Sequence, residues 1–287
     1  MEDDDFTYLL DKIREATFLE FPFRHIEIQD FLSPEHLQLI LNDDQIHFQE
    51  PARDKDLVKA LQDRGYVPIR FPGCTLNLKE YLAKLAKGEQ LRVNDNQPIE
   101  GYGVAFRLKR TQFRNKRIKA LINFLNGPRF KEALLEKFGR KDVAKRTSII
   151  TAIQKYLTGY EISPHCDIRR KCMTYLLNIN RDDSVSNYPV HTKLLRMKPE
   201  REYCYERWAN DVNTERCWVP WDWCESVKQV SANNTIVIFA PGNDTLHAVK
   251  LDYPHKQFQR TQIYGNLMYA DIPQLPSSTW KKLRRTE

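Results

Sequence analysis

Short strand-like segments dominate the chain beyond Gly139, and this pattern constrains the fold more than any other feature of the sequence. Turn signals such as Pro241-Gly242 separate the segments from one another. The predicted strands are Ser148–Tyr156, Met173–Asn180, Thr192–Leu195, Asn234–Ala240, Thr245–Leu251 and Thr261–Ala270. A run of short strands with turns between them predicts a barrel or jelly roll built of β-structure.

The first half of the chain has a mainly helical pattern instead. Apolar residues between positions 8 and 16 have the spacing of a short amphipathic helix. A strand is predicted at His25–Ile28, and Ser33 can cap a helix that begins at Pro34. Further helices are predicted at Leu57–Arg64, Leu78–Lys87, Ile118–Leu125 and Phe130–Phe138. Helices first and strands afterwards predict an α+β fold whose helices cover one face of a sheet.

The length of 287 residues allows one large domain or two small ones, and we expect a single domain over 1–287. Residues 1–147 are expected to give mainly helical support with an N-terminal strand, residues 148–270 the β-core, and residues 271–287 a basic tail. Residues 181–227 form a less regular insertion in the core with four of the five tryptophans. Because so many aromatic groups are costly to leave in water, this insertion is predicted to pack down or to line a binding cleft.

The charge of the chain and its termini narrow the choice of partners and compartment. Much of the net charge of +7 lies in residues 107–119 and in the C-terminal KKLRR. Such runs are usually solvated faces, so we do not expect a nucleic-acid partner, although docking on residues 107–119 is an alternative. No apolar run is long enough to span a bilayer, and the acidic N-terminus is no secretory signal, so we expect a cytoplasmic protein.

The six cysteines contain no CxxC pair, and in a reducing compartment they are expected to be free thiols. An alternative is a structural zinc site made of Cys204, Cys217, Cys224 and His191. Because the spacings of these residues match no zinc template, free thiols are the favoured interpretation.

A histidine and a carboxylate, His165 and Asp167, follow a strand-like segment. In an extended chain both side chains point the same way, with Cys166 turned away. Such a pair suits two ligands of a 2-His-1-carboxylate triad, which leaves three positions open on ferrous iron. The pair is weak evidence by itself, since His25 and Glu27 repeat the pattern.

Two residues downstream strengthen the interpretation of this pair. His247 lies on a predicted strand that follows a Pro-Gly turn, and Arg260 begins another strand thirteen residues later. A guanidinium suits a two-point grip on a planar carboxylate. A lone strand histidine is more often a core residue and a lone arginine a surface charge, so the candidate site rests on the order of all four residues.

At this point the sequence resembles the Fe(II)/2-oxoglutarate-dependent dioxygenases, and within them the prolyl-4-hydroxylase-like branch. The resemblance rests on the segment YLTGYEISPHCD, on RRKCMTYLLNIN just after it, and on TIVIFAPGNDTLHAV with Arg260. The strand and helix at residues 25–42 also look like the opening of the family's fold. The resemblance implies a double-stranded β-helix, a jelly-roll or cupin-like core with helices packed on its outer face.

The resemblance also implies roles for individual residues. It makes His165, Asp167 and His247 the ligands of Fe(II) and the catalytic centre, with 2-oxoglutarate and O2 as co-substrates. The residues implied to bind 2-oxoglutarate are Arg260, through the C5 carboxylate, together with Tyr156 and Asn178. Thr174 is a further candidate, because it shares a face of its predicted strand with Asn178. Alternation along Ser148–Leu157 independently predicts that Gln154 and Tyr156 share a face that can line a pocket.

Several positions depart from the family pattern. Gln262 stands where a serine or threonine is common, and YPVHTKLL replaces a usual Gly-Gly step. Asn266 replaces the second arginine of the branch that demethylates nucleic acids, which disfavours base repair. The carboxylate of Asp167, which halogenating relatives lack, favours hydroxylation.

The expected activity is hydroxylation of an unactivated C–H bond in a small-molecule or amino-acid-like substrate, with release of succinate and CO2. The insertion at residues 181–227 is expected to help form a lid. One alternative is a hydroxylase of protein side chains, of the prolyl type, which would have a peptide or protein substrate. The other is a catalytically inert jelly-roll binding module.

Overall fold

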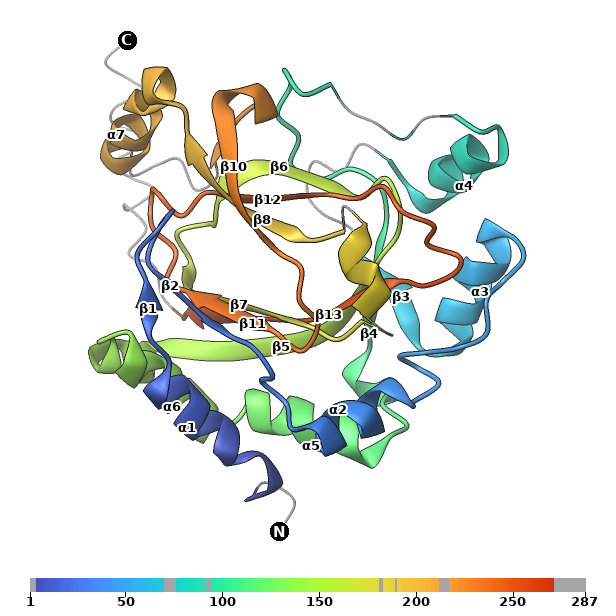
Figure 1. Ribbon diagram of the computed structural model, residues 1–287, viewed down its shortest axis with the longest axis horizontal. Helices are drawn as coiled ribbons and strands as arrows, with labels where there is room; N and C mark the ends of the chain where they lie inside the picture. Colours follow the sequence, from blue (N-terminus) through green and yellow to red (C-terminus); the bar gives the residue numbers. More distant parts are fainter. Residues whose placement is uncertain are drawn as a thin grey trace, which may run out of the picture.

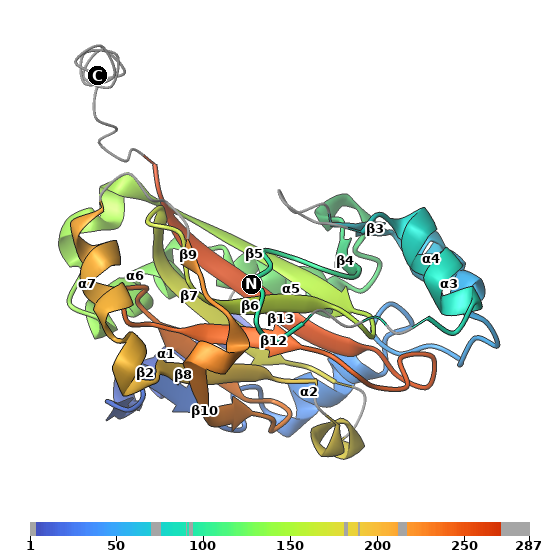
Figure 2. The same cartoon turned by 90° about the horizontal axis from the view of Figure 1, so that it is seen from above.

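The computed structural model describes residues 4–69, 76–89, 91, 94–180, 183–188, 190–211 and 217–270. Two antiparallel sheets face each other (Figures 1 and 2). The larger sheet has the order β1 (Phe18–Leu19), β2 (His25–Ile28), β11 (Ile236–Phe239), β7 (Lys171–Asn178), β13 (Arg260–Tyr269), β5 (Thr147–Tyr156), β4 (Ala105–Leu108) and β3 (Tyr66–Pro68). The smaller sheet has the order β10 (Cys224–Val230), β8 (Thr192–Met197), β12 (His247–Lys250), β6 (Glu161–Cys166) and β9 (Cys217–Trp218).

Helices lie on the outside of this pair of sheets. Figure 1 shows α1 (Tyr8–Glu15), α2 (Pro34–Leu41), α5 (Lys116–Leu125) and α6 (Pro128–Lys137) along the outer face of the larger sheet. The other helices are α3 (Asp54–Asp63) and α4 (Leu78–Ala86), near β3, and α7 (Tyr203–Asn210), at the opposite end of the molecule. None of the described helices is both long and apolar enough to cross a membrane.

Helix α5 illustrates how the sequence produces this layer. Asn115 caps the helix, because its side-chain oxygen accepts from two main-chain N–H groups of the first turn. The apolar stripe recurs at the spacing of one helix face, with Ile118, Leu121, Ile122 and Leu125 all buried. These side chains belong to the main hydrophobic core between the helices and the larger sheet. The face of the sheet that points away from the helices is therefore free to carry polar groups.

A close approach inside the larger sheet depends on Gly265. Gly265 of β13 lies opposite Tyr175 of β7, and a Cβ atom on it would be 1.9 Å from the Tyr175 ring carbon Cζ. The Tyr175 hydroxyl is 2.5 Å from Thr151 Oγ1 on β5. The aromatic ring thus crosses β13 and ties three strands together, which only a glycine permits.

The predicted α+β class is confirmed, with helices and antiparallel sheets in one assembly. The six strands predicted after Gly139 and the helices predicted before it are all found within a few residues of their expected bounds. The first 147 residues contain more strand than expected, because β1, β3 and β4 join β2 in the larger sheet. These strands have two to four residues each, too few to produce a periodic pattern. The expected tail at 271–287 lies outside the described residues.

Candidate metal centre and adjoining cavity

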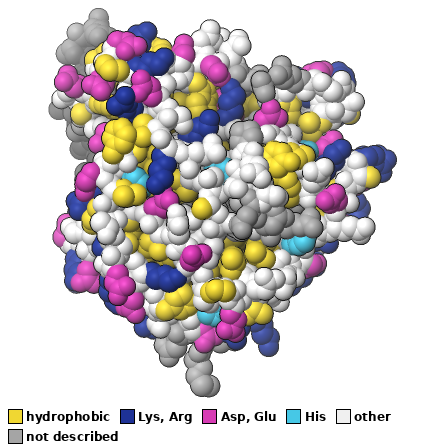
Figure 3. Space-filling view, viewed as in Figure 1, with side chains coloured by type: hydrophobic (Ala, Val, Ile, Leu, Met, Phe, Trp, Pro, Cys, Tyr) yellow, Lys and Arg dark blue, Asp and Glu magenta, His cyan; other side chains and the backbone are white. Residues whose placement is uncertain are grey.

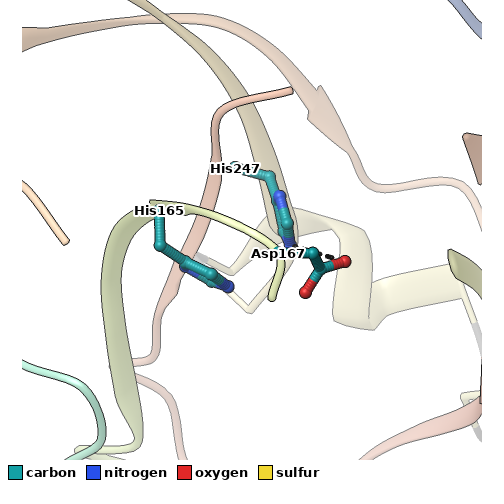
Figure 4. A group of neighbouring side chains, drawn as sticks. All are labelled: His165, Asp167 and His247. Carbon is teal, nitrogen blue, oxygen red and sulfur yellow. Dashed lines mark ion pairs between the residues drawn. The ribbon is translucent and has the colours of Figure 1, made fainter. Parts of the chain in front are cut away.

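Three side chains converge where β6 and β12 pair. His165 lies near the end of β6, Asp167 follows that strand, and His247 begins β12 directly opposite His165. One ligand atom from each of the three lies within 4.8 Å of the others. Figure 4 shows both rings turned toward the region of the carboxylate. The strand register thus brings together two histidines that are 82 positions apart in the chain.

Hydrogen bonds leave one nitrogen of each imidazole available as a ligand. His165 Nδ1 is 2.8 Å from the carbonyl oxygen of Ser163, and His247 Nδ1 is 3.0 Å from that of Thr245. A carbonyl only accepts, so both Nδ1 atoms carry the proton and both Nε2 atoms have a free lone pair. Two imidazole nitrogens and a carboxylate fit the donor set of a 2-His-1-carboxylate iron site.

The protonation states also fit a metal site. Burial, followed by the neighbouring His247, lowers the pKa of His165 to about 3. Burial likewise lowers the pKa of His247. Burial alone would raise the pKa of Asp167, but Lys171 and the two histidines reverse this and hold the pKa below its ordinary value. At neutral pH the site therefore offers neutral imidazoles and an ionised carboxylate, the states that bind a divalent metal.

Two residues of β7 hold the Asp167 carboxylate. Thr174 Oγ1 donates to Asp167 Oδ2 at 2.6 Å, and the Lys171 ammonium pairs with Oδ1. Lys171 also donates to the hydroxyl of Tyr264 at 2.8 Å. Sequence reasoning did not select Lys171, and its one signal was a position four residues after Asp167, at the start of the next strand. The carboxylate is thus oriented before any metal binds.

A cavity of about 390 Å³ lies between the two sheets and includes all three of these candidate ligands. Among the other lining residues are Arg107, Gln154, Tyr156, Thr174, Arg260 and Trp218. The alternation predicted for β5 is thus observed, since Gln154 and Tyr156 face the cavity and Ile153 lies in the core.

Arg260 is a buried cation at one end of this cavity, with 2% of its surface exposed. Its guanidinium lies 4.5 Å from the centre of the Tyr156 ring, and its Nη2 donates to Thr192 Oγ1 at 3.1 Å. Its Nε has no hydrogen-bond partner in the part of the chain that is described, and no carboxylate there pairs with the guanidinium. A buried charge of this kind requires an anion, which a bound ligand can supply.

Tyr156 and Asn178, which are also predicted to bind the co-substrate, have different hydrogen-bond partners from each other. The Tyr156 hydroxyl donates to Gln154 Oε1 at 2.5 Å, and burial raises the pKa of Tyr156 to about 12. Asn178 donates to the carbonyl oxygens of Val230, at the end of β10, and of Ala232, and its Oδ1 accepts from Gln262 Nε2 at 3.1 Å. Asn178 is not among the residues that line the cavity. Its contact with a co-substrate therefore stays a prediction from sequence.

The aromatic insertion at residues 181–227 partly packs and partly lines the cavity. Trp208 and Val219 join a hydrophobic cluster with Leu246 and Ala248. The ring of Trp218 stacks on His165 with 6.5 Å between ring centres, and Trp218 lines the cavity. The two outcomes expected for this segment are therefore both observed.

Three arginines of the basic segment at residues 107–119 have different surroundings. Arg117 pairs with Asp5, Arg114 donates to the main chain at Asp63, and Arg107 lines the cavity. On the face shown in Figure 3, Lys and Arg side chains are interspersed with Asp and Glu.

No second metal site is found among the described residues. Cys204 and Cys224 are free thiols there, as expected. The side chain of Cys217, the third cysteine of the alternative zinc site, lies outside the described residues.

No protein-family model matches the chain, and no curated protein sequence matches it either. Among solved structures, the chain is similar to a prolyl-4-hydroxylase from Pseudomonas putida, at 9% identity and a TM-score of 0.39 over 92% of this chain and 98% of that one. It is similar to AviO1 from Streptomyces viridochromogenes Tue57, at 11% identity and a TM-score of 0.37 over 95% and 98% of the two chains. It is also similar to full-length T7H from Neurospora crassa in complex with alpha-ketoglutarate, at 10% identity and a TM-score of 0.36 over 93% and 79%. At such low scores these similarities do not identify the function, which we infer from the cavity itself.

Proposed function

We propose that the protein is an Fe(II)- and 2-oxoglutarate-dependent oxygenase of the prolyl-4-hydroxylase-like type. On this proposal the two facing sheets are a double-stranded β-helix, and residues 1–287 make one domain. One observation carries the proposal: a 2-His-1-carboxylate cluster lies in the same cavity as a buried arginine that has no counter-ion among the described residues.

The metal ligands on this proposal are Nε2 of His165, Nε2 of His247 and the carboxylate of Asp167. Iron held by these groups would supply the oxidation chemistry in which O2 converts 2-oxoglutarate to succinate and CO2 and the substrate is hydroxylated. The hydrogen bonds to Ser163 and Thr245 keep both rings in the required tautomer. Thr174 keeps the carboxylate turned toward the rings.

Arg260 is the proposed anchor for the C5 carboxylate of 2-oxoglutarate. The guanidinium would satisfy its Nε donor, which pairs with no described residue, by a two-point contact with that carboxylate. Thr192 and the Tyr156 ring restrict the guanidinium before the co-substrate arrives. The Tyr156 hydroxyl, which keeps its proton at neutral pH, can turn from Gln154 to donate to the same ligand. Binding the co-substrate in this orientation costs the protein little conformational entropy, because the residues that line the cavity are already in place.

The proposed reaction is hydroxylation of an unactivated C–H bond in a small-molecule or amino-acid-like substrate. Support comes from the cavity volume of about 390 Å³, which suits small ligands. The chain's task is to hold one C–H bond beside the metal, which is positioning rather than acid-base catalysis. A protein side-chain hydroxylase of the prolyl type is the second candidate, and peptide-stimulated turnover of 2-oxoglutarate would favour it.

Anaerobic titration with Fe(II) and 2-oxoglutarate tests the proposal. We expect a visible charge-transfer band with the native chain and none with His165→Ala. His36→Ala is the matched control, because His36 contacts Tyr8 on the outer helices and not the cavity. Absence of the band in the native chain, or a band unchanged in His165→Ala, would favour the inert binding module.

A further inference from the structure

The larger sheet carries a row of polar side chains at one level of its inner face. Arg107 of β4 lies opposite Gln154 of β5, which lies opposite Gln262 of β13, which lies opposite Asn178 of β7. Side chains paired in this way point to the same face and lie within contact distance of each other. Most of the row is already engaged within the protein: Gln262 donates to Asn178, and Gln154 accepts from Tyr156.

Arg107 is the member of the row whose charge is not used. Its side chain is exposed and lines the cavity, and it makes no hydrogen bond or ion pair with any residue that the structure describes. Gln154 Nε2 likewise donates to no described residue. A planar guanidinium beside an amide NH2 group forms a set of donors that fits a carboxylate.

The other two cations among the described residues that line the cavity, Lys171 and Arg260, are already assigned. Lys171 pairs with Asp167 and donates to Tyr264. Arg260 is the anchor for 2-oxoglutarate in the proposed function. An anionic group on a second ligand would therefore meet Arg107.

The cavity is lined by apolar side chains near the metal centre. Ile150 is 56% exposed although it is a large apolar residue, and it lines the cavity together with Met268 and Ile168. Ile150 pairs with Asn266, which pairs with Thr174, the residue that holds Asp167. The apolar rim is therefore level with the metal centre.

The distance between the donor groups of Arg107 and Gln154 and the apolar residues around Ile150 follows from strand geometry. Gln154 and Ile150 lie on the same face of β5, four residues apart, which corresponds to about 13 Å. A ligand that lay along β5 would span an anion-binding end and an apolar end beside the metal.

We infer that the substrate is an amphipathic carboxylic acid, with its carboxylate bound by Arg107 and Gln154 and its apolar carbons lying against Ile150, Met268 and Ile168. This inference rests on the proposed function, because it places the apolar carbons beside the iron. Arg107 is thus a specificity residue, and a neutral analogue of the substrate loses the ion pair with the guanidinium.

N-octanoylglycine and its neutral amide, N-octanoylglycinamide, are probes that test the inference. Their affinities are measured by calorimetry on the anaerobic protein loaded with Fe(II) and 2-oxoglutarate. We expect the acid to bind at least about tenfold more tightly than the amide, since a charge-assisted pair replaces a neutral contact. Arg107→Gln should abolish the preference, and Arg107→Lys should keep only part of it because the two-point geometry is lost.

Arg110→Gln is the matched control, because Arg110 is exposed on the same basic segment and does not line the cavity. It should keep the full preference for the acid. Equal affinity of acid and amide for the native protein, no binding of either, or an unchanged preference in Arg107→Gln would overturn the inference. Weaker 2-oxoglutarate binding in Arg107→Gln would overturn it too, because Arg107 would then serve the co-substrate.

A failure of the oxygenase proposal can be distinguished from a failure of the inference about Arg107. If no charge-transfer band forms with Fe(II) and 2-oxoglutarate, the oxygenase proposal fails irrespective of the probes. The preference for the acid can still be measured on the protein without metal, and it reports on Arg107 alone.

Discussion

The side chains around Asp167 show how single residues prepare a metal ligand. The Thr174 hydroxyl and the Lys171 ammonium each contact one carboxylate oxygen, so the group is fixed in both position and charge. On the other side of the cavity, Thr192 and Tyr156 restrict Arg260 in a similar way. Both ends of the proposed co-substrate site therefore depend on hydroxyl, ammonium and aromatic groups that are not themselves proposed metal ligands.

Thr174→Val is expected to weaken metal binding by about 10- to 100-fold, because Asp167 loses the hydrogen bond that orients it. The measurement is a titration of the protein with Co(II), which needs no turnover. Thr174→Ser keeps the hydroxyl and should restore most of the affinity. Equal affinities for Thr174→Val and the native protein would show that Lys171 alone orients the carboxylate.

Arg260→Met is expected to raise the 2-oxoglutarate concentration needed for half-maximal succinate formation by about 100-fold, since two charge-assisted hydrogen bonds are lost. Arg196→Met is the control, because Arg196 is an exposed arginine of β8 that pairs with Glu225 away from the cavity. An unchanged requirement in Arg260→Met would move the carboxylate anchor to another cation, with Arg107 the first to examine.

Strands β5, β7 and β13 form the element on which the cavity is built. Their outer faces bury apolar residues against the helices, and their inner faces carry the polar row and the contacts to Asp167. Tyr175 crosses β13 at Gly265 and packs its ring edge to face on Phe130 of α6. The register of the three strands is therefore coupled to the packing of a helix.

Gly265→Ala should destabilise the fold by about 3 kcal/mol, at the upper end of the usual cost of overpacking, because the added Cβ would lie 1.9 Å from Tyr175 Cζ. Urea unfolding followed by circular dichroism measures the change. In a Tyr175→Leu background the same substitution should cost much less, which a double-mutant cycle will detect. Additive effects of the two substitutions would mean that the ring does not set the requirement for glycine.

At the scale of the whole molecule, the buried residue Lys155 contacts parts of the chain that are far apart in sequence. The Lys155 ammonium on β5 donates to the carbonyl oxygen of Ile46 and to Thr261 Oγ1, both at 2.7 Å. It lies near the rings of Phe48 and Tyr66, and its side chain is fully buried. Burial lowers the pKa of Lys155 to about 7 from an unfolded value near 10.5. This residue therefore links the stability of the protein to pH.

The sign of this linkage follows from the proton count. Between about pH 7 and pH 10.5 the unfolded chain binds a proton at Lys155 that the folded chain has released, so stability should rise with pH in that window. The free energy of unfolding, measured by urea denaturation from pH 6 to 9, is compared between the native chain and Lys155→Met. Above about pH 7, we expect the free energy of unfolding of the native chain to rise relative to that of Lys155→Met, by at most about 1.4 kcal/mol per pH unit. A difference that does not vary with pH would contradict a lowered pKa at Lys155.

The sequence by itself determined the features that depend on local periodicity. The alternation along β5 predicted that Gln154 and Tyr156 share the cavity face, and the His165 and Asp167 pair marked the metal centre. Helix positions followed from caps and apolar spacing, as at Asn115. These features are predictable because a side chain's direction depends on its own few neighbours in the chain.

The tertiary structure decided which distant residues meet. It placed His247 opposite His165, bonded Asn178 to the carbonyl oxygens of Val230 and Ala232, and brought Arg107 into the cavity through the short strand β4. None of these contacts is encoded locally, because each depends on the register between strands that are far apart in the chain. A shift of one residue in that register would turn every side chain of a strand to the opposite face, so only the assembled sheets define the site.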